Sequence, residues 1–98
     1  MTRRIQQLFD LTGQTALITG GSRGLGLQMA HALGEAGARL MLCSRKADDL
    51  EAAVAELKAA GIEADYIAAD CGKEEDIRRL AHETMKRMGR IDILINNA

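Results

Sequence analysis

A short glycine-rich stretch between an apolar run and a helical pattern constrains this chain more than any other part of its sequence. The apolar run is residues 15–18, and residues 19–26 then read Thr-Gly-Gly-Ser-Arg-Gly-Leu-Gly. Glycine lets the backbone turn sharply and approach a ligand closely. The helix that follows begins with N–H groups that have no partner inside the helix, and its dipole favours negative charge there. The stretch therefore predicts a phosphate-binding turn.

The rest of the chain alternates between strand and helix patterns. Strands are expected at 15–19, 39–44, 63–69 and 91–96, and helices at 24–36, 47–60 and 73–88. Strands separated by helices run parallel, with right-handed crossovers. The pattern predicts an α/β fold, a three-layer Rossmann-type doubly wound parallel sheet with strand order 3-2-1-4. Ligands bind such a sheet at the switch point, here between the first and fourth strands.

Two of these elements carry further expectations. The third helix has one long face at the helical period, made of Ile77, Leu80, Ala81, Thr84, Met85 and Met88. The fourth strand is apolar and would be the outer strand of the sheet. An uncovered edge of that kind invites pairing with another chain, so we expect the 98 residues alone to self-associate.

Composition excludes several classes of partner. The chain has 98 residues, 47% hydrophobic and 28% charged, which suits one small globular domain. A net charge of −1 and only two aromatic residues argue against nucleic-acid binding. No apolar run approaches the roughly 18 residues of a membrane span, and there is no signal-peptide pattern. A cytoplasmic protein without a membrane partner is expected.

The cysteines and histidines do not form a recognisable motif. Cys43 and Cys71 lie far apart in the sequence without C-x-x-C spacing, so we expect two reduced, partly buried thiols rather than a metal site or redox pair. His31 and His82 fall inside helical patterns and have no second ligand at the next turn. No metal site is predicted.

The spacing of the glycines points to a family. The common dinucleotide fingerprint is G-x-G-x-x-G, whereas this chain has G-x-x-x-G-x-G preceded by threonine. This variant resembles the coenzyme loop of the short-chain dehydrogenase/reductase family, and the resemblance extends along essentially the whole chain. It implies that the loop contacts the cofactor through Gly20, Ser22, Arg23, Gly24, Leu25 and Gly26.

Two later positions match the same family. Asp70 ends the third strand, where the family has an aspartate that accepts a hydrogen bond from the adenine amino group; the next backbone N–H, that of Cys71, meets the ring. Asn96-Asn97-Ala98 looks like the start of the family's N-N-A-G motif, which borders the adenosine ribose, so Asn97 and Ala98 are expected at the cofactor. The alternatives are that Asp70 only forms a turn and Asn97 only caps a strand.

The end of the second strand indicates which cofactor is used. An acidic residue there would bind the ribose hydroxyls and repel a 2′-phosphate. This chain has Ser44-Arg45-Lys46 instead, and arginine can bind a phosphate through two hydrogen bonds. Arg23 is a second cation of the kind that NADP-preferring members carry. The pattern favours NADP(H) over NAD(H), unless Arg45 and Lys46 are simply solvated charges at a helix start.

No catalytic residue is assigned. The family's chemistry uses a Tyr-x-x-x-Lys pair and a serine later in the chain, whereas the one tyrosine here, Tyr66, has no lysine four residues on. Residues 1–98 therefore resemble an NAD(P)-binding Rossmann domain truncated before the catalytic part. The resemblance implies a homo-oligomeric parent, dimer or tetramer, acting on a small carbonyl or alcohol substrate.

Two functions stay open from sequence. One is an oxidoreductase that transfers hydride between NADP(H) and a carbonyl or alcohol. The other is a non-catalytic, redox-sensing nucleotide-binding module. Residues 8–13 resemble the leaders of gluconate 5-dehydrogenase-like and 3-oxoacyl-carrier-protein reductase-like members of the family, which is a hint about the substrate.

Overall fold

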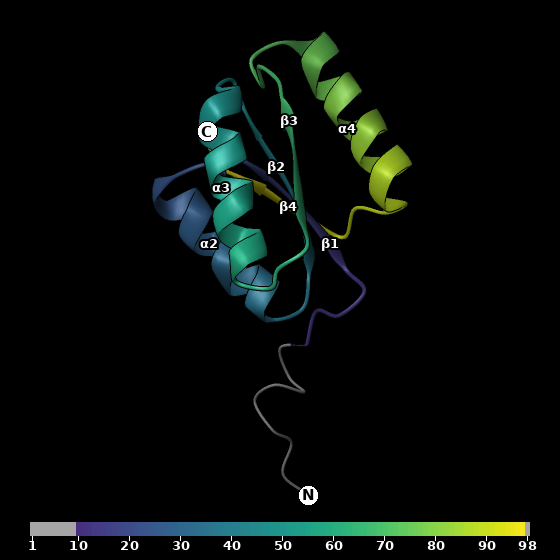
Figure 1. Ribbon diagram of the computed structural model, residues 1–98. Coiled ribbons are helices and arrows are strands. Elements are labelled where there is room, and N and C mark those ends of the chain that lie inside the picture. Colours follow the sequence, from purple (N-terminus) through teal and green to yellow (C-terminus); the bar gives the residue numbers. More distant parts are fainter. Residues whose placement is uncertain (1–9, 98) are drawn as a thin grey trace, which may run out of the picture.

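Strands and helices alternate along the chain as the sequence predicts. The computed structural model describes residues 10–97. The elements are β1 (Thr15–Thr19), α2 (Gly24–Glu35), β2 (Arg39–Ser44), α3 (Ala47–Ala59), β3 (Ala64–Ala68), α4 (Glu74–Met88) and β4 (Ile93–Asn96). The strands form one parallel sheet in the order β3-β2-β1-β4, which confirms the predicted fold class and places the switch point between β1 and β4 (Figure 1).

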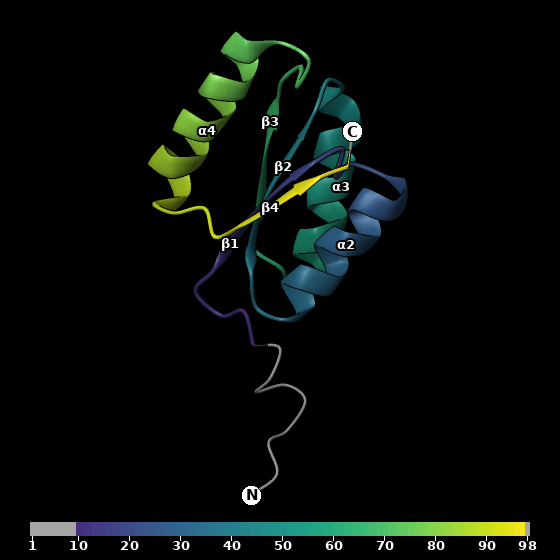
Figure 2. The same cartoon turned by 180° about the vertical axis from the view of Figure 1, so that it is seen from behind.

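The sheet is the middle of three layers. Helices α2 and α3 cover one face and α4 lies against the other, as the two opposite views show (Figures 1 and 2). Alternate residues of β2 serve the two cores, because successive side chains of a strand point to opposite faces. Leu40 and Leu42 belong to the core under α2 and α3, whereas Met41 and Cys43 belong to the core under α4.

The central and outer strands differ in burial. All five residues of β1 are buried, as expected for a parallel strand covered on both faces. β4 lies at the edge, as predicted, and none of its four residues is fully buried.

β4 is shorter than the expected strand at 91–96, and its regular pairing with β1 begins between Ala16 and Ile93. Just before it, the backbone N–H of Asp92 donates to the carbonyl of Thr15 at 2.9 Å. The backbone N–H of Thr15 donates to the carboxylate of Asp92 at 2.8 Å.

Only half of the predicted apolar face of α4 is buried. Leu80, Thr84 and Met88 are covered, whereas Ile77 and Met85 are each 47% exposed. The helical period was correct, but α4 packs against the sheet without a neighbouring helix beside it among the described residues (Figure 2). Part of its apolar face, including Ile77, therefore stays exposed and lines a cavity.

The segment before β1 packs against the end of α2. Residues 12–13 form a turn, and Gly13 has a φ of 85°, in the left-handed region that favours glycine. The backbone N–H of Leu11 donates to the carbonyl of Ala36 at 2.7 Å.

Candidate functional site

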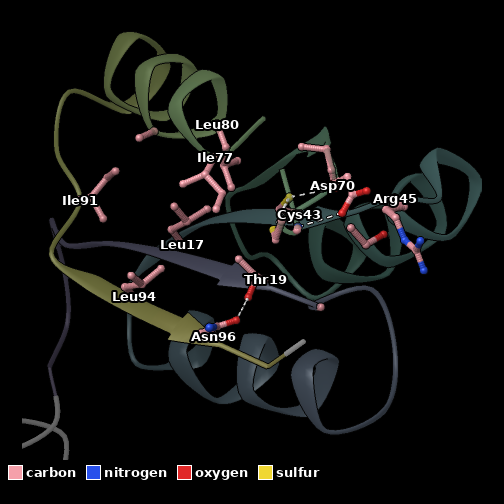
Figure 3. A pocket seen from close by; sticks show the side chains of 16 residues that line it. Leu17, Thr19, Cys43, Arg45, Asp70, Ile77, Leu80, Ile91, Leu94 and Asn96 are labelled. Carbon is pink, nitrogen blue, oxygen red and sulfur yellow. Dashed lines mark hydrogen bonds between the residues drawn. The ribbon is translucent and has the colours of Figure 1, made fainter. Parts of the chain in front are cut away.

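A cavity of about 770 Å³ opens at the carboxyl ends of β1, β2 and β3, between the sheet and α4. Five residues that the sequence assigned to the cofactor line it, namely Gly20, Ser44, Arg45, Asp70 and Cys71. Its other wall is apolar and comes from β1, β4, the turn before β4 and α4, as Figure 3 shows for Leu17, Leu94, Ile91, Ile77 and Leu80. The structure thus brings together residues from three separate βα connections.

The glycine-rich stretch forms a tight turn between β1 and α2. The N–H of Gly20 donates to the carbonyl of Cys43 at 2.7 Å, which ties the turn to β2. Gly26 lies directly against the carbonyl of Gly20, and a Cβ at that position would collide with this oxygen. Gly24 has open space around it but a φ of 60°, so its constraint is conformational. The two glycines are therefore needed for different physical reasons.

The N-terminus of α2 differs from those of the other two helices. The first turn of α3 carries Asp48 and Asp49, and the first turn of α4 carries three carboxylates, which offset the positive end of each helix dipole. α2 has no acidic residue in its first turn and no side chain that caps it. Its backbone N–H groups and positive dipole end are therefore left for an anion from outside these elements.

The end of β2 carries an unpaired cation at the cavity. Arg45 is exposed and lines the cavity wall, and no carboxylate among residues 10–97 forms an ion pair with it. The hydroxyl of Ser44 accepts a hydrogen bond from the N–H of Lys46 at 3.3 Å. Lys46 is the N-cap residue of α3 and does not line the cavity. The alternative that these cations are simply solvated charges at a helix start therefore fits Lys46 but not Arg45.

Asp70 both forms a turn and faces the cavity. Its Oδ1 accepts the N–H of Gly72 at 2.8 Å, and its own N–H donates to the carboxylate of Asp76 at 2.7 Å. The turn-forming interpretation is therefore correct. It does not compete with the ligand interpretation, because Asp70 also lines the cavity beside Arg45 (Figure 3).

At the end of β4 the two asparagines have different positions. Asn96 lines the cavity, and its Oδ1 accepts a hydrogen bond from the hydroxyl of Thr19 at 2.8 Å (Figure 3). Asn97 donates its N–H to the carbonyl of Thr19 at 3.2 Å, and its side chain lies beside Gly26. Asn97 therefore links β4 to β1 and α2, while Ala98 lies outside the described residues.

Not every assigned loop residue reaches the cavity. Ser22, Arg23, Gly24, Leu25 and Gly26 do not line it, and Leu25 is 58% exposed. They surround the start of α2 instead, so their contact with a cofactor stays a prediction. Sequence reasoning also missed Thr19 and Asn96 as cavity residues, although both end strands at the expected switch point.

The two cysteines are neighbours, which the sequence reasoning did not foresee. Their Sγ atoms lie 3.7 Å apart, and both residues line the cavity. Cys43 is buried and Cys71 half-buried, as expected for free thiols. Burial raises the pKa of the Cys43 thiol to about 12. Only the strand order could have predicted this contact, because both cysteines stand at the carboxyl ends of neighbouring strands.

The tyrosine lies away from this site. Tyr66 packs against the core under α2 and α3, and its hydroxyl donates to the carboxylate of Glu51 at 3.0 Å. This hydrogen bond raises the pKa of Tyr66, the opposite of what a catalytic tyrosine needs. His31 pairs with Glu56 between α2 and α3, also outside the cavity.

Residues 10–97 contain neither a candidate metal site nor a candidate membrane-spanning helix. No group of three or more His, Cys, Asp or Glu side chains is placed to hold a metal ion. None of the helices there combines the length and apolar character needed to cross a membrane.

Comparison with known proteins supports the resemblance. Over 90 residues the chain is 44% identical to the rhamnolipid biosynthesis 3-oxoacyl-acyl-carrier-protein reductase of Pseudomonas aeruginosa. The matched segment covers 92% of this chain and 35% of that protein. It is 39% identical over 92 residues to a 2-dehydro-3-deoxy-D-gluconate 5-dehydrogenase of Formosa agariphila, and this match covers 93% of this chain and 35% of the dehydrogenase. The chain spans about a third of the length of these relatives.

A solved structure and a family model agree with these relatives. The crystal structure of a metagenomic short-chain oxidoreductase in complex with NADP superposes with a TM-score of 0.86 and 42% identity, covering 90% of this chain and 40% of that one. Residues 14–98 match the model of the short chain dehydrogenase family. Because this family model covers nearly all of the sequence, this chain belongs to the short-chain dehydrogenase/reductase family.

Proposed function

We propose that this chain is the NADP(H)-binding part of an oxidoreductase that transfers hydride between the cofactor and a carbonyl or alcohol substrate. The observation that carries the proposal is the convergence of Gly20, Arg45 and Asp70 on one cavity at the switch point of the sheet. The relatives named above are a reductase and a dehydrogenase. Their names favour the enzyme over a redox-sensing binding module.

The glycine turn suits the pyrophosphate of a dinucleotide. Gly26 packs against the carbonyl of Gly20, which brings the start of α2 against the end of β1. The first turn of α2 has no carboxylate to repel that phosphate. We therefore assign the pyrophosphate to this turn, together with Ser22, Arg23, Gly24 and Leu25, and the nicotinamide beyond it supplies or accepts the hydride.

The adenosine end suits NADP(H) better than NAD(H). Arg45 stands at the end of β2, about 20 residues beyond the glycine turn, where the ribose is bound in this fold. A guanidinium without a carboxylate partner favours a 2′-phosphate over a free hydroxyl. Asp70 and the backbone of Cys71 are assigned to the adenine, with Asn97 and Ala98 beside the ribose. The solved relative in complex with NADP supports this choice.

The remaining features of the parent enzyme follow from the family. We place the Tyr-x-x-x-Lys pair in the parent outside these 98 residues, because Tyr66 points away from the cavity and is followed four residues later by Asp70. We also expect a homo-oligomer, dimer or tetramer, located in the cytoplasm. The substrate is a small carbonyl compound or alcohol.

The cofactor assignment is tested by reversing one charge. The protein that contains this chain is titrated with NADPH and NADH, with cofactor fluorescence as the readout. We expect tighter binding of NADPH, and in Arg45→Asp a reversed order, because a charge-assisted phosphate contact is lost. That contact contributes on the order of 1.5–3 kcal/mol, or roughly ten- to a hundredfold in affinity.

A charge-matched variant controls this experiment. Lys58→Asp changes the net charge by the same amount at an exposed position in the last turn of α3, and Lys58 does not line the cavity. We expect it to keep the NADPH preference of the unchanged protein. Equal affinities for NADPH and NADH in the unchanged protein would contradict the proposal.

A further inference from the structure

The cavity contains a pair of thiols that the proposed cofactor chemistry does not use. Cys43 is the fifth residue of β2 and is fully buried, on the face of the sheet that α4 covers. Cys71 lies in the turn after β3 and is half-buried. The sheet brings them together because β2 and β3 are neighbours with Cys43 opposite Ile67, so the turn after β3 passes above the end of β2.

The two sulfur atoms are already in contact. The Sγ atoms lie 3.7 Å apart, and the thiol of Cys43 is also within 3.7 Å of the carbonyl oxygen of Ala69 (Figure 3). A disulfide requires a sulfur separation of about 2.0 Å. The approach must come from Cys71, because Cys43 is held inside the sheet ladder whereas Cys71 is followed by the exposed Gly72 in a turn.

We propose that Cys43 and Cys71 form a redox-active dithiol, which a peroxide converts into an intramolecular disulfide that weakens nucleotide binding at the cavity. The chemical half of this proposal stands on the two sulfur atoms alone. The effect on the nucleotide rests on the proposed function, because Cys71 and its neighbour Asp70 are assigned there to the adenine.

The burial of the two thiols sets the order of the steps. Cys43 has a pKa of about 12 because it is buried, so it stays protonated near neutral pH. Cys71 borders the cavity, where a small oxidant can reach it. The Cys71 thiolate attacks one oxygen of hydrogen peroxide, the O–O bond breaks, and hydroxide leaves a sulfenic acid on Cys71. The sulfur of Cys71 thereby loses two electrons, and each of the two peroxide oxygens gains one.

The second step closes the disulfide. The sulfur of Cys43 attacks the sulfenic sulfur of Cys71, the S–O bond breaks, and the oxygen leaves as water with the proton of the Cys43 thiol. In sum, two thiols lose two electrons and one peroxide becomes two water molecules. Formation of this bond pulls the turn that carries Asp70 and Gly72 toward β2, which alters the adenine end of the cavity.

The first experiment asks whether the bond forms within one chain. The 98-residue chain contains only these two cysteines, so its intact mass reports on them directly. After peroxide treatment and unfolding in the presence of N-ethylmaleimide, we expect a monomer that is 2 Da lighter and carries no maleimide. The Cys43→Ala variant should not show this loss of 2 Da. Two maleimides per chain, or links only between chains, would overturn the proposal.

A second measurement tests proximity rather than simple reactivity. Dithiol–disulfide equilibrium against glutathione is measured for the chain in buffer and in guanidinium chloride. We expect the effective concentration of the two thiols to be at least tenfold higher in buffer, because the fold places them together. An equal or lower value in buffer would overturn the proposal.

The last measurement addresses the nucleotide. NADP⁺ is titrated into the reduced chain and into the disulfide form verified by mass. We expect at least tenfold weaker binding to the disulfide form, with recovery after dithiothreitol. Equal affinities would overturn the nucleotide half of the proposal. Failure of the reduced chain to bind NADP⁺ would instead contradict the proposed function, and the mass result would stand independently.

Discussion

The face of the sheet under α2 and α3 carries a closed core, whereas the face under α4 is only partly covered. On the first face, Leu42, Leu50 and Leu57 are completely buried. On the second face, Leu94 remains 66% exposed and Ile77 47% exposed, and both line the cavity. Figures 1 and 2 show the cause, because two helices lie on one side of the sheet and one on the other.

This difference separates stability from binding in the molecule. The closed face holds the larger apolar core and has Gly26 at its contact with the glycine turn. The open face holds the cavity, the unpaired cation Arg45 and the two thiols. Substitutions on the closed face should therefore act mainly on folding, whereas those on the open face should act mainly on what the chain binds.

A large loss of stability is expected at the contact between α2 and the glycine turn. Gly26→Ala places a Cβ against the carbonyl of Gly20, and neither backbone can move without disturbing β1. We expect the free energy of unfolding, measured in urea, to fall by about 3 kcal/mol. Gly24→Ala is the matched control, because it meets no atom and costs only the left-handed conformation, about 1–2 kcal/mol. Equal midpoints for Gly26→Ala and the unchanged chain would refute this assignment.

A pair of leucine truncations compares the two cores directly. Leu50 on α3 is fully buried in the closed face, whereas Leu80 on α4 is buried but borders the cavity. We expect Leu50→Ala to cost about 4 kcal/mol and Leu80→Ala about 2 kcal/mol in urea unfolding, because a side chain beside an existing cavity loses fewer packing partners. Equal losses at the two positions would show that the faces are packed alike.

The smallest effect on stability is expected at the open edge. Leu94→Lys replaces an exposed apolar side chain on the edge strand β4, so the unfolding free energy should change by less than about 0.5 kcal/mol. Light scattering of the 98-residue chain should nevertheless show less self-association, because a charged edge resists pairing. Leu25→Lys, at an exposed apolar position on α2, should not reduce it. A monomeric unchanged chain would contradict the argument.

The sequence by itself determined the order, type and approximate bounds of the elements. Its signals are local: the helical period, the carboxylates that begin α3 and α4, and the glycines that end or start helices. The strand order followed from the order expected for the first four strands of a doubly wound sheet, and the ligand site expected at the switch point between β1 and β4 followed from that order.

The tertiary structure alone decided which atoms meet. Strand register and the direction of each side chain set the contact of Cys43 with Cys71 and the bond of Thr19 to Asn96. Neither pair has a sequence spacing that marks it, because 28 and 77 residues separate the partners. The exposed half of α4 was equally invisible, since helical period shows which residues share a face, but only packing shows how much of that face is covered.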